Sequence, residues 1–302
     1  MVQRKAIPAY LYMPLATLCW GVSFISIKIA LEVYTPITIV TVRLFFVALI
    51  LGAVFLFAHK KNPVPRGKDL LLLVFLGFLN PFLSFLLETT SMLYVSASMA
   101  SIMMSTVHLI TPLAAFLLLK EKVRIFNIVG LFISFAGLCL IIFYRGAEAE
   151  YTPLGLILII CTVLAGVLYT IVAKKLLDRY SSLTIVTFQQ VFGFLMYIPL
   201  FFFTGNGAGF FGQPFHATGF LNILFLAVFP STIAYYLFND GIKKIGPTRA
   251  NAYINLVPVI TAIASYFILK ESVGIVKALG IIIVITGLFL SQKKKRMPVP
   301  VK

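Results

Sequence analysis

The sequence is short of charge, and above all of acidic residues. Only 11% of the 302 residues are charged, whereas 61% are hydrophobic and the mean hydropathy is +1.04. A soluble domain carries about 25% charged residues, so the composition excludes an ordinary soluble protein and indicates a chain that lies in a membrane. Asp and Glu number 9 against 25 Lys and Arg, which gives a net charge of +16. Because these basic residues lie between apolar runs and not on one basic face, we expect no nucleic-acid partner.

Cysteine is scarce as well, and a nucleotide-binding motif is absent. Cys19, Cys139 and Cys161 lie inside apolar runs without metal-ligand spacing, which argues against a disulfide framework or a metal site. No Gly-x-x-x-x-Gly-Lys-Ser/Thr motif occurs, so nothing indicates an ATP site of that type. We therefore expect no cofactor and no catalytic residues.

Apolar runs long enough to span a membrane are abundant. A spanning helix needs about 20 apolar residues, and the sequence predicts ten such helices joined by short connections. The longest connection, from about Thr204 to Ala217, is Gly-rich and is expected to be a loop. The predicted spans are approximately Ile7–Leu31, Pro36–Phe57, Leu70–Thr90, Ser96–Leu119, Ile125–Phe143, Pro153–Val172, Leu183–Phe203, Thr218–Asp240, Pro247–Leu269 and Ile275–Leu290.

The basic residues predict the orientation of these spans. With the N-terminus on the inner side, 20 of the Lys and Arg residues fall in inner segments, three in outer segments and two within spans. Cytoplasmic segments carry the excess of Lys and Arg. We therefore expect both termini to be cytoplasmic, and the short inner loops with a basic tail favour a bacterial inner membrane.

The chain contains an internal repeat. Residues 100–138 align without a gap on residues 250–288, with 14 of 39 positions identical, and Tyr34 with Thr38–Thr41 recurs as Tyr180 with Thr184–Thr187. Because five spans is an odd number, the second half enters the membrane from the opposite side. The predicted fold is an all-α polytopic membrane protein with ten helices in a 5+5 inverted-topology repeat, its units being residues 1–146 and 147–302.

Several short motifs in this order resemble the EamA-like family of the drug/metabolite transporter superfamily. The likeness covers about residues 7 to 292, and it implies export or exchange of small metabolites, amino acids or drug-like solutes. It also implies that the fifth and tenth spans can join two protomers as a homodimer. The motifs are Cys19-Trp20-Gly21-Val22-Ser23-Phe24 with Lys28, Arg43, Tyr94-Val95-Ser96-Ala97-Ser98, Ile245-Gly246-Pro247 and the Leu-Lys-Glu hinges at 119–121 and 269–271.

Helix interruptions at related depths of the two halves point to a site near the membrane midplane. A proline removes a helical hydrogen bond and frees a carbonyl, which in lipid must be satisfied or must line a wet cavity. A plain kink is the alternative. His108 occupies the position that Pro258 has in the other half, either as a substrate contact or as a neutral histidine bonded to a carbonyl. The residues of this set are Asn80, Pro81, His108, Pro112, Pro230 and Pro258.

Ionisable and aromatic residues complete the candidate substrate site. Arg43 lies about eight residues below the outer face, where a charge costs about 2.5–3.5 kcal/mol to insert, so it needs a partner. Glu88 is the expected partner or proton carrier, although the two could equally form a structural ion pair. Gln189 is the repeat mate of Arg43. Aromatic and amide residues that could line the cavity, or simply pack, are Trp20, Tyr169, Tyr235, Tyr253 and Asn255.

The sequence thus predicts a secondary transporter that moves a small solute by alternating access, with an exporter or exchanger favoured. An intramembrane enzyme acting on a lipid-soluble substrate, or a passive metabolite channel, is the alternative. An enzyme would need a nucleophile with a base, or paired metal ligands, at membrane depth, and the sequence offers neither.

Overall fold

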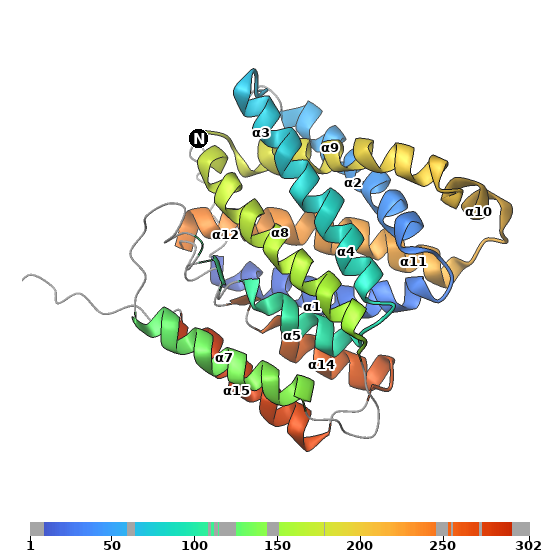
Figure 1. Cartoon of the computed structure of the whole chain (residues 1–302). Helices are drawn as coiled ribbons and strands as arrows, with labels where there is room; N and C mark the ends of the chain where they lie inside the picture. Colours follow the sequence, from blue (N-terminus) through green and yellow to red (C-terminus); the bar gives the residue numbers. More distant parts are fainter. Residues whose placement is uncertain are drawn as a thin grey trace, which may run out of the picture.

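A computed structural model of the chain shows a bundle of helices (Figure 1). It describes residues 9–58, 64–107, 110–111, 114, 125–143, 151–177, 179–245, 253–254, 256–271 and 274–291. Within these ranges, extended pairing is limited to one isolated antiparallel bridge between Val95 and Tyr151. The predicted all-helical class is confirmed.

Most of the described helices follow the predicted apolar runs, whereas the predicted spans Ser96–Leu119 and Pro247–Leu269 lie partly outside the described residues. Six helical stretches of the described chain are long and apolar enough to cross a membrane, and α7, α14 and α15 contain shorter apolar stretches. In the first half the elements are α1 (Ala9–Leu31), α2 (Pro36–Ala58), α3 (Lys68–Gly77), η2 (Phe78–Leu83), α4 (Ser84–Ser91), α5 (Ala97–Ser105) and α7 (Ile125–Phe143). In the second half they are α8 (Pro153–Leu177), α9 (Ser182–Phe203), α10 (Asn206–Gly212), α11 (Ala217–Leu226), η3 (Ala227–Ala234), α12 (Tyr235–Ile245), α14 (Val257–Ile268) and α15 (Ile275–Ser291).

The bundle is apolar outside and carries polar side chains inside. Phe57, Phe203 and Ile275 are 80% exposed or more, whereas Arg43 is 4% exposed and Gln189 is fully buried. In water, exposed apolar area costs about 25 cal/mol per Å², but lipid solvates it, and helices satisfy their own main-chain hydrogen bonds there. The chain is therefore a multi-pass membrane protein.

One connection differs from the prediction. The Gly-rich segment expected to be a loop contains the short helix α10, which begins after Gly205 in a left-handed conformation with φ of 76°. Phe210 of this helix contacts the ring of Tyr34 at a centroid distance of 5.7 Å. The loop prediction was wrong here because tertiary packing of the phenylalanines outweighs the low helix propensity of glycine.

Helices α7 and α15 pack along each other at the lower edge of the bundle in Figure 1. A Cβ atom on Gly137 would lie 2.9 Å from the carbonyl oxygen of Gly280, and Ser134 Oγ donates to the Val284 carbonyl at 2.8 Å. Small residues allow such close approach between membrane helices. These glycines thus serve contacts within one chain.

The remaining helices interlock the two halves. Helix α1 packs against α11, η3, α12 and α14 of the second half, and α8 packs against α3, η2, α4 and α5 of the first. Helix α2 lies along α9. Residues from both halves therefore face a common interior.

Candidate functional site

A cavity of about 290 Å³ lies between the two halves. Its wall includes side chains of α1, α2, α4, α5, α8 and α12, together with Asn80 of η2 and Ile254 and Val257 beside the start of α14. This volume is at the lower end of the range of about 300–1,000 Å³ that is usual for ligand pockets. The cavity is suited to a small solute.

Arg43 is the buried cation of the cavity wall. Its Nε donates to Ser231 Oγ at 2.6 Å, and its guanidinium carbon lies 4.1 Å from the centroid of the Phe85 ring. Helix α2 supplies the arginine, η3 supplies Ser231 and α4 supplies Phe85. A hydrogen bond and a cation–π contact therefore hold the guanidinium, and its Nη atoms, which have no acceptor among the described residues, can bind a ligand.

Glu88 lines the same cavity from α4. The structure pairs Arg43 directly with Ser231 and not with Glu88: among the described residues, the only ion pair within 4.0 Å joins Arg179 to Asp69. Arg43 and Glu88 therefore line one cavity without forming a direct ion pair.

One helix interruption contributes to the cavity wall, and a second holds two of the lining side chains from behind, since Pro230 and Ser231 of η3 accept hydrogen bonds from Trp20 and Arg43. Asn80 has the non-helical angles φ −150° and ψ 118° inside η2, and a cis peptide bond joins it to Pro81. In η3, the carbonyl of Pro230 accepts a hydrogen bond from Trp20 Nε1 at 3.1 Å. Each interruption contains a proline, which removes a hydrogen bond from the helical ladder and is a common cause of helix kinks.

Aromatic side chains form the apolar part of the wall. Trp20 meets Tyr235 and Phe238 edge to face, with centroid distances of 5.4 Å and 5.1 Å. The hydroxyl of Tyr235 donates to Asn80 Oδ1 at 3.4 Å, and that of Tyr169 donates to Gln189 Oε1 at 3.0 Å. Gln189 does not line the cavity; it lies behind Tyr169 and orients its hydroxyl.

The other predicted site residues lie either outside the described residues or outside the cavity wall. His108, Pro112 and Asn255 lie outside the described residues. Tyr253 is half-buried and is not part of the cavity wall, whereas its neighbour Ile254 is. Pro258 is in the first turn of α14, where its missing N–H is not needed by the helix. The helix is thus broken before Pro258, and the proline does not kink a continuous span.

Sequence reasoning missed the small polar residues of the wall. A spacing of four along an apolar run could have revealed them, because it places side chains on one helix face. Asn80, Ser84 and Glu88 show this spacing, as do Thr162 and Thr170 on either side of Gly166. The missed polar residues are Ser23, Ser84, Ser101, Ser105, Thr111, Thr162, Thr170 and Asn239.

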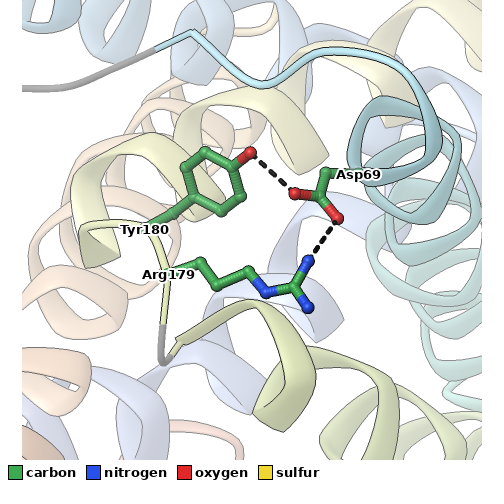
Figure 2. A network of polar contacts seen from close by, with 3 residues as sticks. All are labelled: Asp69, Arg179 and Tyr180. Carbon is green, nitrogen blue, oxygen red and sulfur yellow. Dashed lines mark hydrogen bonds and ion pairs between the residues drawn. The ribbon is translucent and has the colours of Figure 1, made fainter.

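A separate polar network joins α3 to the connection between α8 and α9 (Figure 2). Asp69 accepts from Arg179 Nη1 at 3.2 Å and from the Tyr180 hydroxyl at 2.8 Å. The hydrogen bond to the Asp69 carboxylate, with some burial and the negative charge, raises the pKa of Tyr180 above its usual value. None of the three residues lines the cavity, so this network connects helix ends.

The described residues contain no group of three His, Cys, Asp or Glu side chains that could hold a metal ion. A polytopic helical membrane protein whose two halves enclose a cavity beside interrupted helices has the architecture of a solute transporter. The family assignment agrees. The chain matches the model of the EamA-like transporter family over residues 7–143 and 153–292, and it belongs to that family, within the drug/metabolite transporter superfamily.

Related proteins carry similar descriptions. Two proteins of Bacillus subtilis (strain 168), described as "Uncharacterized transporter YetK" and "Uncharacterized transporter YcxC", are each 28% identical. The first alignment covers 98% of this chain and 90% of the relative, and the second covers 100% of both. An "Uncharacterized transporter" of Archaeoglobus fulgidus is 25% identical over 95% of this chain and 99% of its own.

A crystal structure with 13% sequence identity matches at a TM-score of 0.68, covering 94% of this chain and 97% of the other. At that identity the match supports the fold alone.

Proposed function

We propose that the protein is a secondary transporter that moves a small solute across the cytoplasmic membrane by alternating access, as an exporter or exchanger. Its ten spans form two inverted five-helix units, residues 1–146 and 147–302, with both termini in the cytoplasm. The observation that carries this proposal is the pair of helix interruptions at Pro81 and Pro230, which occupy equivalent places in the two units and adjoin one cavity. Asn80, beside Pro81, lines the cavity, and the Pro230 carbonyl accepts a hydrogen bond from the lining residue Trp20. Broken helices around a central site are typical of transporters built from inverted repeats.

The packing of the helices supports the inverted repeat. In the repeat α1 corresponds to α8, η2 to η3 and α5 to α14. The contact of α1 with η3 has its counterpart in the contact of α8 with η2, and that of α1 with α14 has its counterpart in that of α8 with α5. The pairs α2–α9, α5–α14 and α7–α15 each map onto themselves. Such a set of contacts is what a two-fold axis in the membrane plane would generate.

Hydrogen bonds at one end of the cavity support alternating access. Glu271 Oε1 accepts from the main-chain N–H of Ala97 at 2.7 Å, and Oε2 accepts from Ser98 Oγ at 2.7 Å. In the proposed orientation this contact joins α5 to the end of α14 at the outer face, while the lining residues Ala173 and Asn239 lie toward the inner face. The structure then corresponds to a state closed on the outside.

Counterflow in proteoliposomes tests the proposal. Vesicles are loaded with unlabelled amino acids, amines, purines or sugars, and uptake of the labelled counterpart is followed. Saturable exchange of an unchanged solute supports a carrier. Non-saturable flux would indicate a passive channel, and a chemically altered solute would indicate an enzyme; either result refutes alternating-access transport.

A further inference from the structure

Most polar groups of the described cavity wall already donate their hydrogen bonds to other groups of the protein. Among the described residues of the wall, every serine and threonine donates its hydroxyl to a main-chain carbonyl three to five residues earlier in the chain. Ser84 donates to Leu79, for example, and Thr162 to Leu158. A hydroxyl that has donated its proton retains two lone pairs, so these groups are acceptors toward a ligand.

The aromatic and amide side chains of the wall also donate hydrogen bonds within the protein. The Tyr169 hydroxyl donates to Gln189 and the Tyr235 hydroxyl to Asn80, while Trp20 Nε1 donates to the Pro230 carbonyl. The amide nitrogen of Asn239 donates to the Tyr235 carbonyl at 2.8 Å, which leaves its oxygen available. Glu88 adds two carboxylate oxygens to this acceptor set.

Few donors remain for a ligand. They are the Nη atoms of Arg43 and the amide nitrogen of Asn80, for which no acceptor is found among the described residues, and the second N–H of the Asn239 amide, which donates only one hydrogen bond there. The described wall contains one basic residue, Arg43, and one acidic residue, Glu88, so its formal net charge favours neither a cation nor an anion. The excess of hydrogen-bond acceptors in the wall determines instead which ligand is preferred. A buried donor or acceptor without a partner is costly, so a ligand rich in donors fits this wall best.

We propose that the transported solute is a hydrogen-bond donor, and in particular a small primary amine whose ammonium group binds to Glu88 and the surrounding hydroxyl oxygens and whose apolar or aromatic body packs against Trp20. The proposal rests on the function proposed above and names its substrate class. The face of Trp20 or Phe238 attracts any ammonium through a cation–π contact. The acceptor oxygens, in contrast, favour only an ammonium that carries N–H groups.

This difference permits a test with matched compounds. Trp20 is the only tryptophan of the chain, so its fluorescence reports binding to purified protein in detergent without any transport. The probes are phenethylamine, its N-trimethyl derivative and hydrocinnamate, which share an aromatic body. We expect phenethylamine to bind roughly tenfold or more tightly than the trimethyl compound, the effect of one or more hydrogen bonds to a charged group, and more tightly than the carboxylate.

Variants locate the effect in the cavity. Tyr169→Phe removes one acceptor and should reduce the preference for the primary amine, whereas Tyr180→Phe, outside the cavity, should leave it unchanged. Equal binding of the two ammonium compounds, tighter binding of hydrocinnamate, or no binding of phenethylamine at millimolar concentration by folded protein overturns the proposal. Counterflow of another solute class would then still support a transporter, so the two failures are distinguishable.

Discussion

The contact between Glu271 and α5 provides the sharpest test of alternating access. The carboxylate accepts hydrogen bonds from Ala97 N–H, Ser98 N–H and Ser98 Oγ, and Ser98 Oγ also contacts Ser265 Oγ at 2.7 Å. It therefore caps the N-terminus of α5, where main-chain N–H groups have no helical acceptor. We expect Glu271→Ala to destabilise the state that is closed on the outside.

The size of this effect follows from the hydrogen bonds. Each contributes about 1 kcal/mol net, and the partial exposure of Glu271 allows water to replace some of that. A loss of about 2 kcal/mol shifts the equilibrium between closed and open states about 30-fold. Glu271→Gln keeps an acceptor oxygen without the charge and should give an intermediate shift.

The assay is chemical labelling from the outer face. A cysteine at Ser101, which lines the cavity one turn into α5, is introduced after Cys19, Cys139 and Cys161 have been replaced. We expect a membrane-impermeant maleimide to label this cysteine up to about 30-fold faster in the Glu271→Ala background. The labelling rate should rise by the same factor as the population of the outward-open state.

Lys270→Ala is the matched control, because the Lys270 side chain is exposed and lies in the same connection. It should leave the labelling rate unchanged. An unchanged rate in folded Glu271→Ala protein would refute the assignment of this contact as the outer closure.

Three further predictions concern the site and the scaffold. Arg43→Ala and Glu88→Gln should each abolish counterflow while the protein remains folded and inserted, and normal flux in both would exclude an essential role of the two charges. Gly287→Ala should lower the thermal unfolding temperature, because the added Cβ would lie 2.5 Å from Ser134 N and 2.6 Å from the Gly130 carbonyl, an overpacking cost of about 1–3 kcal/mol. The control Gly52→Ala, which has open space around its Cβ, should leave the unfolding temperature unchanged. Equal unfolding temperatures of the two variants would contradict the close packing. Tyr180→Phe should lose stability at neutral pH. Since the Tyr180 pKa is raised in the folded state, its contribution is complete below the ordinary tyrosine pKa of about 10 and disappears as the pH rises through the folded value. Unfolding curves of both proteins from pH 7 upward check this, and a difference that grows with pH would contradict it.

Much of the architecture could be predicted from local properties of the sequence. Apolar runs of about 20 residues predict membrane helices wherever they occur, so the bounds of α1, α2 and α9 were anticipated within a few residues. The prolines at 81 and 230 predicted interruptions because proline lacks the N–H that a helix needs, and Arg43 was recognised because a charge at that depth requires a reason.

Other features depend on how distant segments pack, and no local pattern contains that information. Arg43 binds Ser231 and not Glu88 because η3 lies against α2, and Glu271 reaches the N-terminus of α5 across 173 positions of sequence. Two glycines seven residues apart in each copy of the repeat, Gly130 with Gly137 and Gly280 with Gly287, predict close helix packing, but they do not identify the partner helix. The sequence by itself determined that helices form, where they break and which residues are costly in lipid. Only the tertiary structure decided which faces meet, and hence which protons remain free in the cavity, because that depends on the relative rotation and register of helices far apart in the chain.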